Sequence, residues 1–97
     1  MTIETFKEIW EKNDDSYLQF KQVNNKTSNR SDVHAFNLLD KLVPGITDMV
    51  AAAEHDEIFL GVEIEDLAKV ITEDQIIELI QCGVRFDENY DGLAMFV

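Results

Sequence analysis

Residues 87–92, Asp-Glu-Asn-Tyr-Asp-Gly, carry oxygen-bearing side chains at a spacing typical of a calcium-binding loop. Such a loop places ligands at its first, third and fifth positions and a glycine at its sixth. Its later positions also supply ligands, whereas residues 93–97 are apolar. The turn of a β-hairpin explains the same residues, because Asn, Asp and Gly favour tight turns. We therefore expect no metal site here, and no cofactor.

Few other side chains have the chemistry of an active site. The segment 54–57, Glu-His-Asp-Glu, places a histidine beside an aspartate, as metal phosphohydrolases do, but only His34 remains to complete such a site. Cys82 and a histidine could form a nucleophile and a base, yet Cys82 falls on a predicted amphipathic helix, where a packed thiol is usual. No phosphate-binding glycine loop or Gly-x-Ser-x-Gly elbow is present. The sequence therefore predicts a protein that is not an enzyme.

Charge is the most uneven property of the chain. Twenty acidic and eight basic residues give a formal net charge of −12. Residues 1–43 hold seven acids and six bases, whereas residues 44–97 hold thirteen acids and only Lys69 and Arg85. Such a surface repels phosphate at long range, so we expect no direct binding of nucleic acid. Solubility alone can explain acidity, but a surface built for solubility mixes both signs, so the asymmetry favours a basic macromolecular partner.

Apolar periodicity predicts most of the secondary structure. The capping box Thr72-Glu-Asp-Gln75 opens one helix, and Gly83 is expected as its left-handed C-cap. Residues 17–23 fit a helical turn or a short strand, and residues 24–31 form a polar loop. The expected helices cover residues 3–12, 31–43, 46–55, 64–71 and 72–83, and the expected strands are residues 58–62 and a hairpin of residues 84–88 and 93–97.

These elements indicate one α+β domain over residues 1–97, with a charge-balanced helical part (1–43) and an acidic part (44–97). With 45% apolar residues, no long apolar run and no signal-peptide pattern, we expect a soluble cytoplasmic protein. The order helix, strand, helix, capped helix, hairpin in residues 46–97 resembles a winged helix-turn-helix. That resemblance implies that the capped helix would enter the major groove of DNA. Here it offers Glu73, Asp74, Gln75 and Glu78, which have the wrong charge for that role.

In size, charge and missing catalytic residues, the chain resembles small phage-encoded inhibitors of host defence, among them anti-CRISPR and anti-restriction DNA mimics. The resemblance implies a non-catalytic inhibitor in the bacterial cytoplasm that occupies a nucleic-acid-binding groove, such as that of a CRISPR surveillance complex. Two alternatives are an immunity protein or antitoxin that neutralises a basic toxin, and a winged-helix-like regulator that acts through protein contacts. The residues expected to bind the partner are Asp56, Glu57, Glu63, Glu65, Asp66, Glu73, Asp74, Glu78, Asp87, Glu88 and Asp91.

The charge asymmetry also predicts which substitutions weaken binding. Reversing the charges of Glu73, Asp74 and Glu78 should weaken association, because these residues belong to the acidic part. The control reverses the charges of Glu4, Glu8 and Glu11, which lie in the predicted helix over residues 3–12 of the charge-balanced part. It should have little effect on association.

Overall fold

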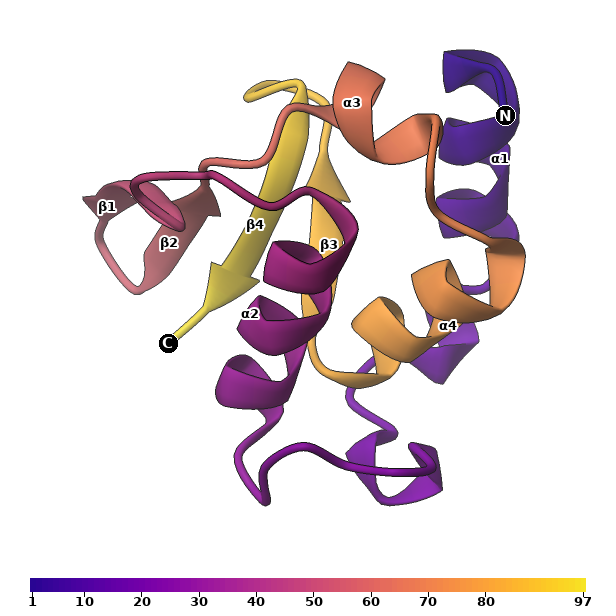
Figure 1. The fold of residues 1–97 in the computed structure, drawn as a ribbon, viewed down its shortest axis with the longest axis vertical. Helices are drawn as coiled ribbons and strands as arrows, with labels where there is room; N and C mark the ends of the chain where they lie inside the picture. The colour runs from indigo at the N-terminus through magenta and orange to yellow at the C-terminus, as the bar shows by residue number, and fades with distance from the viewer.

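The computed structural model describes all 97 residues, Met1–Val97. Four helices and four strands confirm the predicted α+β class (Figure 1). Two short 3₁₀ turns, η1 (Asp14–Ser16) and η2 (Phe20–Gln22), follow the first helix. The helices are α1 (Ile3–Lys12), α2 (Ser31–Leu42), α3 (Ile64–Ala68) and α4 (Glu73–Gln81). The strands are β1 (Val50–Glu54), β2 (Glu57–Leu60), β3 (Val84–Asp87) and β4 (Gly92–Phe96).

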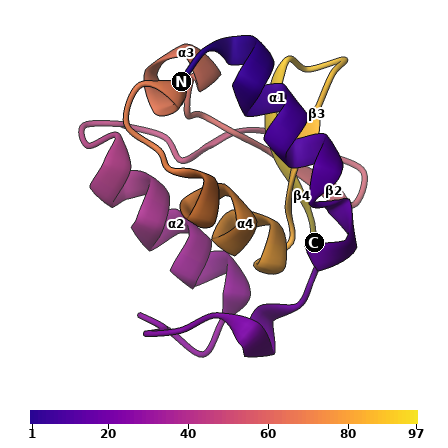
Figure 2. The ribbon, with the colours of Figure 1, turned by 90° about the vertical axis from the view of Figure 1, so that its right-hand side faces the viewer.

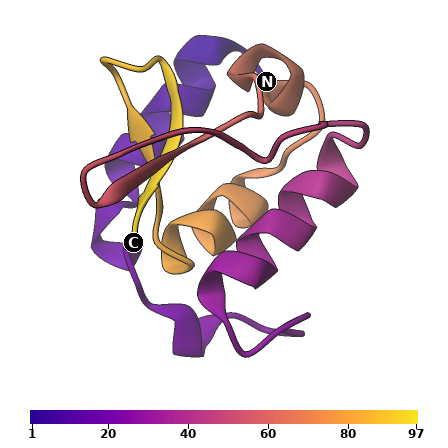
Figure 3. The same cartoon turned by 90° about the vertical axis from the view of Figure 1, so that its left-hand side faces the viewer.

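The four strands form one antiparallel sheet in the order β1-β2-β4-β3. Each hairpin contributes two neighbouring strands, and the pairing of β2 with β4 joins the hairpins. Helices α2, α3 and α4 lie on one side of this sheet (Figure 3). Helix α1 lies at the β3 edge, where it contacts α4 and β3 (Figure 2). A surface shared by α1 and the second hairpin is therefore created by tertiary packing alone.

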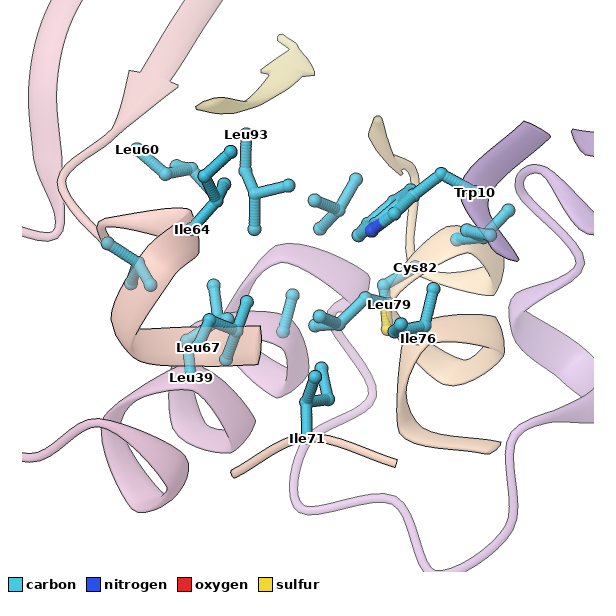
Figure 4. Close-up of a cluster of buried hydrophobic side chains, with 14 of the residues drawn as sticks. Trp10, Leu39, Leu60, Ile64, Leu67, Ile71, Ile76, Leu79, Cys82 and Leu93 are labelled. Carbon is cyan, nitrogen blue, oxygen red and sulfur yellow. The ribbon is translucent and has the colours of Figure 1, made fainter. Parts of the chain in front are cut away.

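The core fills the space between the sheet and the helices (Figure 4). Leu60 and Leu93 from the sheet face Ile64 and Leu67 from α3, and all four side chains are almost completely buried. Each such side chain contributes about 1.5–3 kcal/mol through burial. Trp10 from α1 joins the same cluster. The charge-balanced part and the acidic part of the sequence thus share one core.

Local sequence signals place the start of α1 and both ends of α4 correctly. The Thr2 hydroxyl accepts a hydrogen bond from the backbone N–H of Thr5 and starts α1. The predicted capping box is confirmed, because Thr72 and Gln75 exchange side-chain-to-backbone hydrogen bonds at the start of α4. Gly83 follows that helix with a φ of +97°, a conformation that glycine adopts without strain.

The predicted helix over residues 46–55 is wrong. Residues 50–54 form strand β1, and all five of its side chains are exposed. Residues 51–53 are alanines, so a helix here would have little apolar surface to bury. Backbone pairing with β2 instead satisfies the peptide groups of this segment, and the turn between the strands places His55 at a φ of +57°. The 3.6-residue spacing of apolar residues did not reveal this hairpin, because that spacing reports one face of a helix and not the pairing of two strands.

This correction also changes the winged-helix comparison. The order helix, strand, helix, helix, hairpin is present, but its first helix is α2 rather than residues 46–55, and β1 is an additional strand. Helix α3 ends at Ala68 and is shorter than predicted, whereas residues 17–23 contain a 3₁₀ turn and not a strand. No helix combines the length and the apolar character needed to cross a bilayer.

Candidate functional site: an acidic surface with an aromatic groove

A groove of about 850 Å³ lies between α1 and the β3–β4 hairpin, and we call it the α1–hairpin groove. Its aromatic lining residues are Trp10 from α1, Tyr17 from the segment after it, and Phe86 and Phe96 from the two strands. The Phe96 side chain is 59% exposed, so part of this aromatic surface is open to solvent. The volume lies in the range of sites that hold small ligands or side chains of a partner.

Five carboxylates also line the α1–hairpin groove. Glu4, Glu8 and Glu11 project from α1, Asp14 lies just after this helix, and Glu88 comes from the hairpin turn. None of the five is within ion-pair distance of a basic group, and all five are exposed. Sequence reasoning missed the first four because they belong to the charge-balanced part. The spacing of the three glutamates was a usable signal, since residues three or four apart lie on one face of a helix.

Three of the predicted partner-binding acids are only partly exposed and already have partners within the fold, and their role in partner binding stays a prediction. Glu57 forms an ion pair with Arg85. Asp87 accepts hydrogen bonds from the backbone N–H groups of Asn89 and Tyr90 at 2.9 and 3.0 Å, and from the Arg85 side chain at 3.2 Å. The third acid, Glu78, is 29% exposed at its side chain and binds a buried histidine.

The Asp87 carboxyl also explains why residues 87–92 form a turn. The hydrogen bond from Tyr90 N–H, together with those from Arg85 and Asn89 N–H, holds the pKa of Asp87 below its ordinary value of 3.8 despite partial burial. A carboxylate that receives two backbone N–H groups in its own turn closes that turn locally. No group of three or more His, Cys, Asp or Glu residues in the structure is arranged to hold a metal ion.

His34 connects Glu78 to the polar loop before α2. Its Nδ1 accepts the backbone N–H of Thr27 at 3.0 Å, so the proton is assigned to Nε2, which donates to the Glu78 carboxylate at 2.6 Å. The Thr27 hydroxyl lies 3.1 Å from the same Nδ1 and accepts a hydrogen bond from Asn37 at 3.0 Å. Because His34 is only 3% exposed, its partners satisfy a buried polar ring.

The Thr27 hydroxyl, the His34 imidazole and the Glu78 carboxylate follow the order of a catalytic triad, but their hydrogen bonds differ from those of a triad. The Nδ1 lone pair that would take a proton from the Thr27 hydroxyl already accepts a backbone N–H. Neither Thr27 nor His34 lines the α1–hairpin groove. The network therefore ties the loop to α2 and α4. Cys82 is fully buried, and burial followed by the nearby Glu78 charge raises its pKa to about 12, so it remains a thiol at neutral pH.

The other eight predicted acids are all exposed, but they lie in separate places. Helix α3, the start of α1 and the β3–β4 turn lie at one end of the molecule in Figures 1 and 3. That end carries Glu63, Glu65 and Asp66 at the start of α3, with Glu88 and Asp91 in the turn. The remaining three are Asp56 in the β1–β2 turn, and Glu73 and Asp74 at the start of α4.

No family model, no curated protein and no solved structure matches this chain. Its function therefore has to be inferred from its own surface.

That surface has far more free negative than free positive charge. Seven of the twenty acidic side chains lie within 4.0 Å of a basic group, and the remaining thirteen are all exposed. Four of the eight Lys and Arg side chains are already in ion pairs, among them Lys7 with Asp91 and Lys12 with Glu73. Bases of the charge-balanced part thus neutralise acids of the acidic part. The free carboxylates extend over α1 as well as α3.

Proposed function

We propose that this protein is a non-catalytic acidic inhibitor that mimics DNA. It occupies the nucleic-acid-binding site of a bacterial defence protein or complex, such as a CRISPR surveillance complex. The observation that carries this proposal is the set of thirteen exposed carboxylates that have no basic partner within the chain. A basic groove that normally binds phosphates would attract these fixed carboxylates through the same complementarity of charge.

The free carboxylates also lie on secondary structure that fixes their spacing. Glu4, Glu8 and Glu11 repeat along α1 at intervals of four and three residues, which places neighbouring Cβ atoms about 5–6 Å apart. Duplex DNA presents one negative charge for about every 1.7 Å of its axis, so both surfaces are dense arrays of fixed negative charge. The acids in the first turn of α3 also interact favourably with the helix dipole, so they contribute to stability as well.

The position of these acids supports a binding surface at one end of the molecule. Helix α3 and the β3–β4 turn bring Glu63, Glu65, Asp66 and Glu88 to the same end as the start of α1. Acids that are far apart in the sequence, such as Glu63 and Glu88, therefore belong to one negative surface. A basic groove of a partner could contact this surface with several Lys or Arg side chains at once.

The decisive experiment is competition between this protein and duplex DNA for a purified CRISPR surveillance complex. We expect the protein to displace labelled DNA, and the inhibition to weaken as salt rises, because exposed charges are screened over about 8–10 Å at physiological ionic strength. The double variant Glu63→Lys/Glu65→Lys should inhibit about tenfold less, as expected for the loss of two exposed charge pairs. Simultaneous binding of DNA and protein to the complex would refute mimicry.

A matched control uses acids that are equally exposed and unpaired but lie elsewhere. The double variant Asp15→Lys/Asp40→Lys makes the same change in net charge on η1 and on α2. It should inhibit almost as well as the parent. The control proposed from sequence, Glu4, Glu8 and Glu11, is unsuitable because these residues line the α1–hairpin groove. Glu78 is unsuitable as a test residue because its loss would leave the Nε2–H of His34 without an acceptor.

A further inference from the structure

We propose that the α1–hairpin groove binds an arginine-bearing segment of the partner protein. The inference rests on the proposed function for the basic character of that partner, and it adds a specific place where one side chain enters. The groove is distinct from the rest of the acidic surface because it combines carboxylates with aromatic rings. Phosphate mimicry needs only the carboxylates, so the rings call for a second explanation.

The rings of the groove already bind cations of this chain. The guanidinium of Arg85 lies over the Phe96 ring, with its central carbon 4.4 Å from the ring centroid. The Lys7 ammonium lies 5.5 Å from the centroid of Phe86. Both distances are within the 6 Å at which a cation is attracted by an aromatic face. Because Phe96 is 59% exposed, its ring also has surface available to a cation that arrives from outside.

The charges around the groove favour a cationic ligand. Its two bases, Lys7 and Arg85, are both held by acids that do not line the groove: Lys7 by Asp91 at 3.7 Å, and Arg85 by Glu57 and Asp87. The five carboxylates that do line it have no basic partner. An entering cation therefore meets both free negative charge and aromatic surface.

Arginine fits this combination better than other ligands do. Nucleic acid would be repelled by the carboxylates, and an apolar peptide would desolvate them without compensation. A guanidinium is planar, stacks on aromatic rings and binds carboxylates with two parallel hydrogen bonds, whereas the lysine ammonium is a strongly hydrated point charge. The acids spaced along α1 would then contact neighbouring basic residues of the same segment.

Fluorescence of Trp10 provides a direct test, because it is the only tryptophan of the chain and it lines the groove. The probe is a short capped peptide of alternating arginine and glycine. Its control replaces every arginine by citrulline, which has nearly the same shape but no charge. We expect saturable change in Trp10 emission with the arginine peptide and none with the citrulline peptide. An unchanged emission, or an equal response to both peptides, would overturn the proposal.

Variants separate groove binding from general attraction between opposite charges. Glu8→Gln/Glu11→Gln should raise the peptide dissociation constant about tenfold, as expected for two lost exposed charge contacts. Phe96→Ala should raise it about two- to fivefold through loss of cation–π contact, and its half-exposed side chain makes this variant safe for folding. Asp40→Asn/Asp48→Asn removes two exposed charges outside the groove and should change the peptide dissociation constant little. Equal weakening by all three variants would refute a specific site.

The DNA competition experiment and the Trp10 titration together distinguish failure of this inference from failure of the proposed function. If the protein displaces DNA from its partner while Trp10 does not respond to arginine peptides, the groove inference is wrong and mimicry stands. If the groove binds arginine peptides selectively but the protein and DNA bind the partner together, the proposed function is wrong and the groove stands.

Discussion

At the scale of single residues, the same side-chain type has different roles in different surroundings. The sequence presents Asp74 and Glu78 as a spaced acidic pair on one helix. In the structure Asp74 is exposed and unpaired, whereas Glu78 is a hydrogen-bond partner for a nearly buried imidazole. Removing a charge from the surface changes stability little, but removing the partner of a buried polar group leaves that group unsatisfied.

Replacing Glu78 by alanine should therefore destabilise the protein. The Nε2–H of His34 would lose its only acceptor, and a hydrogen bond to a charged group contributes about 1.5–3 kcal/mol. We expect the free energy of unfolding in urea to fall by about 2 kcal/mol. Asp74→Ala on the same helix should cost less than about 1 kcal/mol, the contribution of an acid near a helix start. Equal effects of the two variants would show that the His34 contact adds nothing.

The lowered pKa of Asp87 predicts how stability depends on pH. Because its pKa is lower in the folded state, the ionised carboxylate stabilises the fold above about pH 4, and this contribution is lost as the pH falls through the folded-state pKa. Asp87→Asn should thus unfold at lower urea concentration than the parent at pH 7. The difference between the urea midpoints of parent and variant should narrow at pH 3. A difference that is the same at both pH values would mean that the charge of Asp87 does not contribute to stability.

At the scale of elements, β1 shows how close backbone contact fixes a strand. The N–H of Gly61 donates to the Met49 carbonyl at 2.7 Å, just before β1 begins. A Cβ atom on Gly61 would lie 2.2 Å from the backbone oxygen of Asp48, which is too short for any real contact. The chain just before β1 therefore passes the chain just after β2 at a distance that only glycine allows.

Gly61→Ala should force the start of β1 away from the chain after β2. Because the obstacle is a backbone carbonyl and not a flexible side chain, we expect a loss of about 1–3 kcal/mol in the free energy of unfolding. Amide hydrogen exchange should accelerate in β1 more than in α4, because β1 must move and α4 need not. Unchanged stability together with unchanged protection of β1 would contradict this account of the hairpin.

At the scale of the whole molecule, the net charge of −12 opposes the compact state. The thirteen unpaired carboxylates repel one another, and only part of this repulsion is relieved by the ion pairs between the charge-balanced and acidic parts. A dense negative surface on rigid elements is what a mimic of a polyanion requires. The proposed function thus accounts for a feature that stability does not favour.

Salt should stabilise the free protein. Raising sodium chloride from about 10 mM to about 500 mM shortens the screening length from about 30 Å to less than 8 Å, so repulsion among the carboxylates weakens. We expect the melting temperature to rise by several degrees, and the Asp40→Asn/Asp48→Asn variant to show a smaller rise because it has fewer like charges. A melting temperature that falls with salt would mean that attractive ion pairs dominate the surface.

The sequence alone determined the elements that local signals specify. Thr72 and Gln75 fixed the start of α4, Gly83 fixed its end, and the Asn, Asp and Gly residues of segment 87–92 fixed the second hairpin, because these signals act within a few residues. Overall acidity was also readable from composition. These features did not depend on how distant segments pack.

Only the tertiary structure decided what depends on distant partners. The two hairpins form one sheet because β2 pairs with β4, and Glu78 is only partly exposed because His34, 44 residues away, packs against it. The α1–hairpin groove exists because α1 packs beside β3, which brings the glutamates of a seemingly balanced segment next to Phe86 and Phe96. Periodicity and local charge reveal which residues share a face of one element, whereas contacts between elements are set by packing of the whole core.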